Sequence, residues 1–182
     1  MFKEGAKLFG HPIHQMLIVF PLGLLATSAV FDGIYLGTDN PRWADIAFWL
    51  IAVGVIGGLV SAVFGLIDWL AIPNGTRAKA IGLWHGVGNV VVVGLFAASW
   101  LLRAYMPHET GATPFVLSWV GIGLAVVTGW LGGELVDRLG VGVDKGAHAD
   151  APNSLSGRPA TENAPRTGVG RWWPGAGSRA AT

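Results

Sequence analysis

The stretch Ile46 to Ile67, IAFWLIAVGVIGGLVSAVFGLI, is 22 residues long and contains no charged side chain. An α-helix rises about 1.5 Å per residue, so a helix of this length crosses the roughly 30 Å hydrocarbon core of a bilayer. A second long stretch, Ala80 to Leu102, also carries no charge, and its most polar members are His85 and Asn89. Both stretches therefore predict transmembrane helices.

Two further apolar stretches, Gln15 to Phe31 and Thr113 to Gly133, are long enough to cross the bilayer once their flanks are included. The whole chain is 52% hydrophobic and only 13% charged, which is roughly half the charge of a soluble domain. The first stretch is too long for a signal peptide, and no small-residue cleavage site follows it. The sequence therefore predicts an all-α fold, an integral membrane four-helix bundle.

The distribution of positive charge predicts the orientation of this bundle. The N-terminus, the second loop and the C-terminal exit are flanked by Lys3, Lys7, Arg77, Lys79, Arg138 and Lys145. Only Arg42 and Arg103 flank the other two loops. Because positively charged segments stay on the cytoplasmic side of a membrane, we expect both the N- and the C-terminus to be cytoplasmic.

The domain organisation follows from a change in composition near the end of the last span. Residues 1–144 are predicted to form the four-span transmembrane domain. Residues 145–182 are rich in glycine, proline, alanine and arginine and have no apolar period from which a core could form. We expect them to be a flexible, disordered tail. Its Trp172-Trp173 pair fits contact with the lipid interface or a partner, although a solvated tail is the simpler interpretation.

Several classes of function are excluded or disfavoured by composition. The chain contains no cysteine, which excludes disulfides, iron–sulfur clusters and thiolate metal sites. The formal net charge of +1 gives no indication of nucleic-acid binding. No nucleophile and base stand in a pattern that indicates a hydrolase, so an enzyme acting on its own is not the expected function.

Polar residues inside the predicted spans are the candidates for function, because ionisable groups are costly at membrane depth. Spans one and three begin at the cytoplasmic face and spans two and four end there, so these residues are expected at one depth. They are His11, His14, Asp68, His85, Asn89, Glu134 and Asp137. We expect Asp32, near the outer end of span one, to have only a capping or interfacial role, and His108 and His148 to be solvated.

Helical spacing supports the convergence of these groups. Gly10-His11-Pro12 predicts a helix start with His11 at the cap, and His11 and His14, three residues apart, then share a face. In span two, small residues form a stripe that ends at Asp68, namely Gly54, Gly58, Ser61 and Gly65. Such a stripe packs closely on a neighbouring helix, so Asp68→Leu is expected to be more harmful than Asp32→Leu. Pro21 predicts a kink in span one.

Three interpretations of this layer remain open. Neutral imidazoles can hold a metal ion or haem, with carboxylates as supporting groups. Imidazoles and buried acids can also handle protons. Finally, His14 with Asp68, and His85 with Glu134, can simply pair to fix the packing of the helices.

The two predicted hairpins show a weak internal symmetry. Each has a histidine near the start of its first helix and an acid near the end of its second. The intervals Gly54 to Asp68 and Gly123 to Asp137 are both 14 residues. The histidines do not align at the same offset, so the pattern only suggests a duplication.

Together these residues resemble the bacterial membrane family called domain of unknown function 2231, over about residues 8–144. The resemblance rests on four motifs: Gly10-His11-Pro12-Ile13-His14 with Phe20-Pro21, Gly65-Leu66-Ile67-Asp68-Trp69, Trp84-His85 with Asn89, and Gly129-Trp130-Leu131-Gly132-Gly133-Glu134-Leu135. The family pattern usually has proline after the second histidine and often histidine before the proline of the span. Here these positions are Gln15 and Phe20.

The resemblance implies a four-span protein of the bacterial inner membrane, and some relatives resemble fusions with redox modules such as Rieske domains. The leading hypothesis is a small membrane subunit for electron transfer that binds b-type haem or a transition metal through His14 and His85, with His11 as a third ligand. Asp68, Asn89, Glu134 and Asp137 would be supporting residues. Its partners would be the lipid bilayer and a redox protein or a second copy of the chain. The alternatives are a cofactor-free scaffold or assembly subunit and, third, a proton-coupled transporter.

Overall fold

The computed structural model describes residues 5–105 and 111–163 of the 182-residue chain. Four helices in these ranges are long and apolar enough to cross a membrane, namely Ile13–Thr38, Pro41–Ala71, Arg77–Tyr105 and Thr113–Arg138. The predicted all-α, four-span fold is therefore confirmed. The positions of His108 and of Trp172-Trp173 lie outside the described residues.

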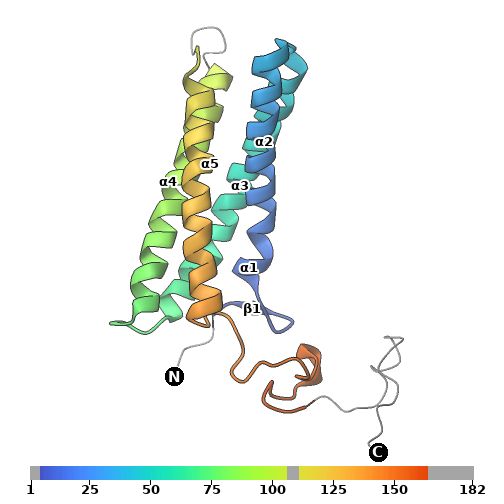
Figure 1. The fold of residues 1–182 in the computed structure, drawn as a ribbon, viewed down its shortest axis with the longest axis vertical. Coiled ribbons are helices and arrows are strands. Elements are labelled where there is room, and N and C mark those ends of the chain that lie inside the picture. The colour runs from blue at the N-terminus through green and yellow to red at the C-terminus, as the bar shows by residue number, and fades with distance from the viewer. Residues whose placement is uncertain (1–4, 106–110, 164–182) are drawn as a thin grey trace, which may run out of the picture. The chain divides into compact units, whose positions relative to one another are not determined.

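The spans form two antiparallel hairpins (Figure 1). In the first hairpin α2 (Val19–Thr38) pairs with α3 (Pro41–Ala71), and in the second α4 (Arg77–Tyr105) pairs with α5 (Thr113–Gly133). α3 also packs on α4, and α2 on α5, so the two hairpins close into one bundle. One buried apolar cluster, Leu25, Ile51, Val92 and Phe96, joins α2, α3 and α4.

The turn between α2 and α3 shows why this chain reverses so sharply. α2 ends at Thr38, and Asp39 takes the left-handed conformation with φ 52°. The side chain of Asn40 then accepts a hydrogen bond from the Arg42 amide, and Pro41 occupies the first helical position. Proline there loses no helical hydrogen bond, so two residues suffice to connect two long spans.

The start of span one differs from the prediction. Residues 7–12 form a short antiparallel hairpin, β1 (Lys7–Leu8) with β2 (His11–Pro12), rather than a helix start. Phe9 and Gly10 make its turn with φ of 52° and 84°, a conformation that glycine adopts without strain. The helix α1 (Ile13–Leu17) begins after Pro12, which stands at the cap position predicted for His11.

The helix of span one is interrupted three residues before Pro21, the residue from which a kink was predicted. α1 ends at Leu17, and α2 begins after a break at Ile18. Pro21 has no amide hydrogen to donate to the carbonyl of Leu17, four residues earlier, and its ring crowds that carbonyl. Span one therefore consists of two helical segments, with His14 on the shorter one.

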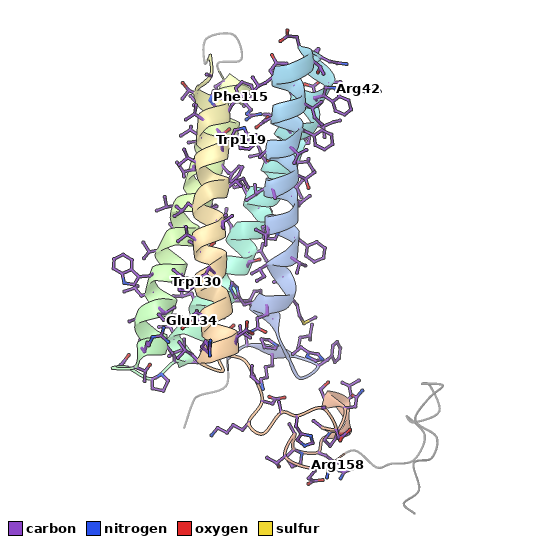
Figure 2. The ribbon with its side chains drawn as sticks, viewed as in Figure 1. Arg42, Phe115, Trp119, Trp130, Glu134 and Arg158 are labelled. Atoms are coloured by element: carbon purple, nitrogen blue, oxygen red, sulfur yellow. The ribbon has the colours of Figure 1, made fainter. Side chains whose placement is uncertain are left out.

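The outer faces of the helices carry large apolar side chains, as expected for contact with lipid. Examples are Val30, Ile56, Val90 and Val126, each more than half exposed. Tryptophans lie toward both ends of α5, Trp119 near Phe115 and Trp130 near Glu134 (Figure 2). The 21 residues of α5 rise about 1.5 Å each, so this helix is about 30 Å long, close to the thickness of the hydrocarbon core of a bilayer.

Residues beyond Gly142 belong to a separate unit. α5 continues into a π-helical turn, Glu134–Arg138, which ends the last span. In the described part of the second unit, residues 143–163, the only helical segment is the single 3₁₀ turn Ser154–Ser156. The predicted flexibility of residues 145–182 stays a prediction.

Candidate functional site

Two histidines, one from each hairpin, meet inside the bundle. His14 lies on α1 and His85 on α4, and their ring centres are 6.3 Å apart with the planes nearly perpendicular, at 89°. The predicted convergence of His14 and His85 from different spans is therefore present in the structure. The end of the bundle that contains them is called the histidine end below.

Each imidazole is bonded to a backbone carbonyl of its own hairpin. Nδ1 of His14 lies 2.9 Å from the Ser61 carbonyl oxygen on α3. Nδ1 of His85 lies 2.8 Å from the Thr128 carbonyl oxygen on α5. A carbonyl oxygen can only accept, so Nδ1 must carry the proton in both rings. In the neutral form each ring then has its lone pair on Nε2.

Glycines make the space that these rings occupy. A Cβ atom on Gly65 would lie 2.8 Å from Cε1 of His14, and one on Gly132 would lie 3.0 Å from Cε1 of His85. Both distances are well inside van der Waals contact. Gly65 and Gly132 therefore let α3 and α5 pack directly against the imidazoles. Gly65 belongs to the small-residue stripe from which close packing of span two was predicted.

Asn89 and Thr128 surround His85 with a polar network. The Thr128 hydroxyl donates to the Asn89 side-chain oxygen at 3.1 Å. The Asn89 side-chain amide donates to the His85 carbonyl at 2.8 Å and lies 3.3 Å from Nε2 of the ring. Ser61, beside His14, has no equivalent network, and its buried hydroxyl finds no hydrogen-bond partner among the described residues.

The carboxylates do not pair with the histidines, which corrects the predicted His14–Asp68 and His85–Glu134 contacts. Asp68 accepts a hydrogen bond of 2.9 Å from the amide of Ala6. It therefore holds the N-terminal segment against the end of α3. Glu134 forms an ion pair of 2.6 Å with Arg77, whose side chain is largely exposed.

The remaining predicted ligands are not gathered into one cluster. The side chains of His11, in β2, and of Asp137, in the π-helical turn, are exposed. In residues 5–105 and 111–163, no group of three or more histidine, aspartate or glutamate side chains is arranged to hold a metal ion. The structure thus brings together His14 and His85 with Asn89, and does not add His11 as a third member.

A second polar site, at the opposite end of the bundle, corrects the interfacial role predicted for Asp32. Asp32 is completely buried and forms two hydrogen bonds with Arg103, of 2.6 and 2.7 Å. Nε and Nη2 of Arg103 also donate to Ser99, at 3.3 and 3.2 Å, and Nη2 donates to Ser118. Its guanidinium further lies 4.8 Å from the ring centre of Phe115. This end is called the ion-pair end below.

The Asp32–Arg103 pair connects three helices, α2, α4 and α5, through one buried guanidinium. The Arg103 side chain is 11% exposed and that of Asp32 is 0% exposed. A buried charge is tolerated only when it is paired and fully hydrogen-bonded. A signal for this pair was present in the sequence, because opposite charges stand near the outer ends of spans one and three.

Comparison with known proteins places this bundle in a family. Residues 10–145, most of the chain, match the family described as predicted membrane protein, domain of unknown function 2231. No curated protein and no solved structure is significantly similar to the chain. The match covers the four spans, both histidines and the Asp32–Arg103 pair. The chain therefore belongs to the membrane-protein family called domain of unknown function 2231.

Proposed function

We propose that this protein is a membrane subunit that binds a single transition-metal ion between His14 and His85 and uses it for electron transfer with a partner protein. The observation that carries the proposal is the pair itself. Two imidazoles from different hairpins lie 6.3 Å apart, and each donates Nδ1–H to a backbone carbonyl.

The carbonyl bonds prepare both rings for a metal. Histidines that bind metals usually donate the hydrogen of their second ring nitrogen to a carbonyl or carboxylate, which fixes the tautomer and raises the basicity of the ligand nitrogen. His14 and His85 already have this arrangement through Ser61 and Thr128. The unpartnered hydroxyl of Ser61 adds a polar atom beside His14 that a bound water or ion would satisfy.

The distance between the rings suits an ion. Metal–imidazole bonds are about 2.0 Å long, so one ion shared by two imidazoles separates the ring centres by about 5 to 6 Å, depending on the bond angle. The observed 6.3 Å is slightly beyond this range, so an ion shared by the two rings requires a nearly linear arrangement of its two nitrogen ligands or a small approach of the rings. Neutral imidazole suits copper, zinc, iron and nickel, and copper and iron also carry electrons.

Packing around the histidines favours an ion over b-type haem. One helical turn from Ser61, a Cβ atom on Gly58 of α3 would lie 3.0 Å from a methyl group of Val93 on α4. One turn from His85, a Cβ atom on Gly88 of α4 would come still closer to the Thr128 side chain of α5. A flat macrocycle between the rings would have to separate these helices, whereas an ion would not.

The test measures metal bound per folded protein in mild detergent. The purified protein is incubated separately with Cu⁺, Zn²⁺ or Fe²⁺. Excess metal is then removed, and the bound metal is measured by elemental analysis. We expect about one ion per chain for at least one metal, and loss of that ion in His14→Gln and in His85→Gln. His148→Gln, in the separate C-terminal unit, is the matched control and should retain it. A Soret band in the visible spectrum of the wild type would indicate haem instead.

The scaffold is the second candidate, and the Asp32–Arg103 network favours it. That network fixes the packing of three helices without any open ligand position. A scaffold needs the histidines only for packing, and a single side-chain hydrogen bond between membrane helices contributes about 0.6 kcal/mol on average. Wild-type protein that takes up none of the three metals and no haem would decide for the scaffold.

A further inference from the structure

The two hairpins have matching buried positions. In the first helices of the hairpins, equivalent residues are 71 positions apart: Pro21 and Val92, Leu25 and Phe96, Ser28 and Ser99, Asp32 and Arg103. In the second helices the separation is 67 positions, and every buried residue of α3 has a buried counterpart on α5: Ala47 and Pro114, Ile51 and Ser118, Gly54 and Gly121, Ser61 and Thr128.

The contacts made at these positions also match. Gly54 lies against Leu25 in the first hairpin, and Gly121 lies against Phe96 in the second. The histidines repeat the relation, because His14 and His85 are also 71 positions apart. Their carbonyl acceptors Ser61 and Thr128, and the glycines Gly65 and Gly132, are also each 67 positions apart.

Helical periodicity explains only part of this agreement. In any four-helix bundle, buried positions recur with spacings of three and four residues, so similar burial patterns alone would carry little weight. Periodicity does not require that a histidine donate to the backbone carbonyl of a serine or threonine. It also does not require that the same imidazole ring pack against a glycine one turn further along that helix. Both relations occur in both hairpins, in the same register as the buried positions.

Equivalent residues meet each other at two places. His14 contacts His85 at the histidine end, and Asp32 contacts Arg103 at the ion-pair end. A residue touches its own equivalent only where both lie close to the rotation axis that relates the two units. The two contacts at opposite ends therefore define a two-fold axis that runs along the bundle.

We infer that the chain is a tandem duplication of one two-helix unit, in which each hairpin is the dimer partner of the other and the pairs His14–His85 and Asp32–Arg103 lie on the internal two-fold axis. This inference does not rest on the metal proposal. The sequence alone suggested another register, in which Gly54 matches Gly123. The structure matches Gly54 with Gly121, and the first and second helices have different offsets because four more residues separate Asp32 from Ala47 than Arg103 from Pro114. The first unit thus has the longer outer connection.

The axis explains the chemistry of the two pairs. Two identical residues on a two-fold axis face each other. Uncharged imidazoles tolerate this arrangement, whereas two identical charged residues would repel each other. Asp32 and Arg103 avoid this, because only the mixed pairing of hairpins joins opposite charges. In a pairing of two first hairpins, one Asp32 would face another, and such juxtaposition of like charges selects against the wrong partner.

The symmetry is approximate where covalent connection differs. α3 and α4 approach each other more closely than α2 and α5 do. The short segment between Ala71 and Arg77 joins α3 to α4, whereas no segment joins α5 to α2. On α4 and α5, Arg103 contacts Ser99, Ser118 and Phe115. The equivalent of Ser118 is Ile51, so this hydrogen bond has no counterpart in the first hairpin.

The experiment reverses the charges across the axis in the full-length protein. Asp32→Arg and Arg103→Asp are made singly and together, and folding is followed by the yield of monodisperse protein and the melting temperature in detergent. If positions 32 and 103 are equivalent, the double variant should recover more than half of the melting temperature that either single variant loses. If the double variant loses as much of the melting temperature as the single variants, or if it fails to fold although the single variants fold, the inference is wrong.

Two serines make the test specific for equivalence. Ser99 accepts hydrogen bonds from Arg103, and Ser28 is its equivalent on α2, four residues before Asp32. In the wild type Ser99→Ala should lower the melting temperature more than Ser28→Ala. In the charge-reversed protein the order should invert, since Ser28 would then accept from the new arginine. An unchanged order would show that the two sites are not related by an axis.

Discussion

Replacing Asp32 by leucine should be among the most destabilising single changes in the bundle. The change removes both hydrogen bonds to Arg103, of 2.6 and 2.7 Å, and leaves a guanidinium that is 11% exposed without its counter-ion. Breaking a buried ion pair by removing one partner costs about 3 to 5 kcal/mol. Ser99 and Ser118 remain as acceptors, so the lower end of that range is the better estimate for this site.

The matched control is Asp68→Leu, which sequence reasoning alone ranks as the more harmful change. Asp68 is only partly buried, and among the described residues it accepts a single hydrogen bond, from the amide of Ala6. Its loss should cost about 1 kcal/mol, since hydrogen bonds to a charged group contribute about 1.5 to 3 kcal/mol and solvent screening reduces this. From the structure we therefore expect the opposite order, with Asp32→Leu more harmful than Asp68→Leu.

Thermal unfolding of the purified variants in one detergent measures this difference. For a chain of this size each kcal/mol shifts the melting temperature by about 2 to 4 °C, so Asp32→Leu should lower it by about 6 to 12 °C. Adding Arg103→Leu to Asp32→Leu should recover much of the loss, because replacing both members of a buried ion pair by apolar residues is often nearly neutral. Equal shifts for Asp32→Leu and Asp68→Leu, or no recovery in the double variant, would show that the buried ion pair does not stabilise the bundle in this way.

Three further outcomes are expected. A reporter fused after Val143 should be cytoplasmic, as the positive charges around the histidine end indicate; a periplasmic reading would place the histidines on the other side of the membrane. Gly132→Ala should displace His85 and cost about 1 to 3 kcal/mol through overpacking, whereas Gly129→Ala, with no atom within 4 Å of its new Cβ, should be tolerated; equal effects would contradict the close packing. Thr128→Val should weaken the polar network at His85 by about 1 kcal/mol, measured by thermal unfolding against Thr38→Val, which alters only an exposed hydroxyl; equal losses would show that the Asn89 contact contributes nothing.

The four spans and the meeting of His14 with His85 were predictable because each depends on position along a helix. Helices that start at the same face bring residues near their starts to similar depths, and the small-residue stripe of span two indicates which face is packed. These relations need only the helical repeat and the alternation of direction, both of which are visible in the sequence.

The partners of the carboxylates were not predictable in the same way. Asp68 binds Ala6 because residues 5–12 fold back as a hairpin, which depends on the positive φ of Phe9 and Gly10. Asp32 was assigned to the interface because it stands near the outer end of span one, whereas α2 packs it inside the bundle against Arg103. Such pairings depend on side-chain directions in three helices at once.

In the proposed function, His14 and His85 together hold one metal ion. X-ray absorption at the edge of the bound metal tests it most directly, because scattering from the imidazole ring identifies histidine ligands and counts them. We expect two imidazoles per ion in the wild type, and neither the ion nor this signal in the His14→Gln, His85→Gln double variant, although that variant still folds. A wild-type spectrum without imidazole scattering, or a double variant that retains the metal with an unchanged spectrum, would contradict it.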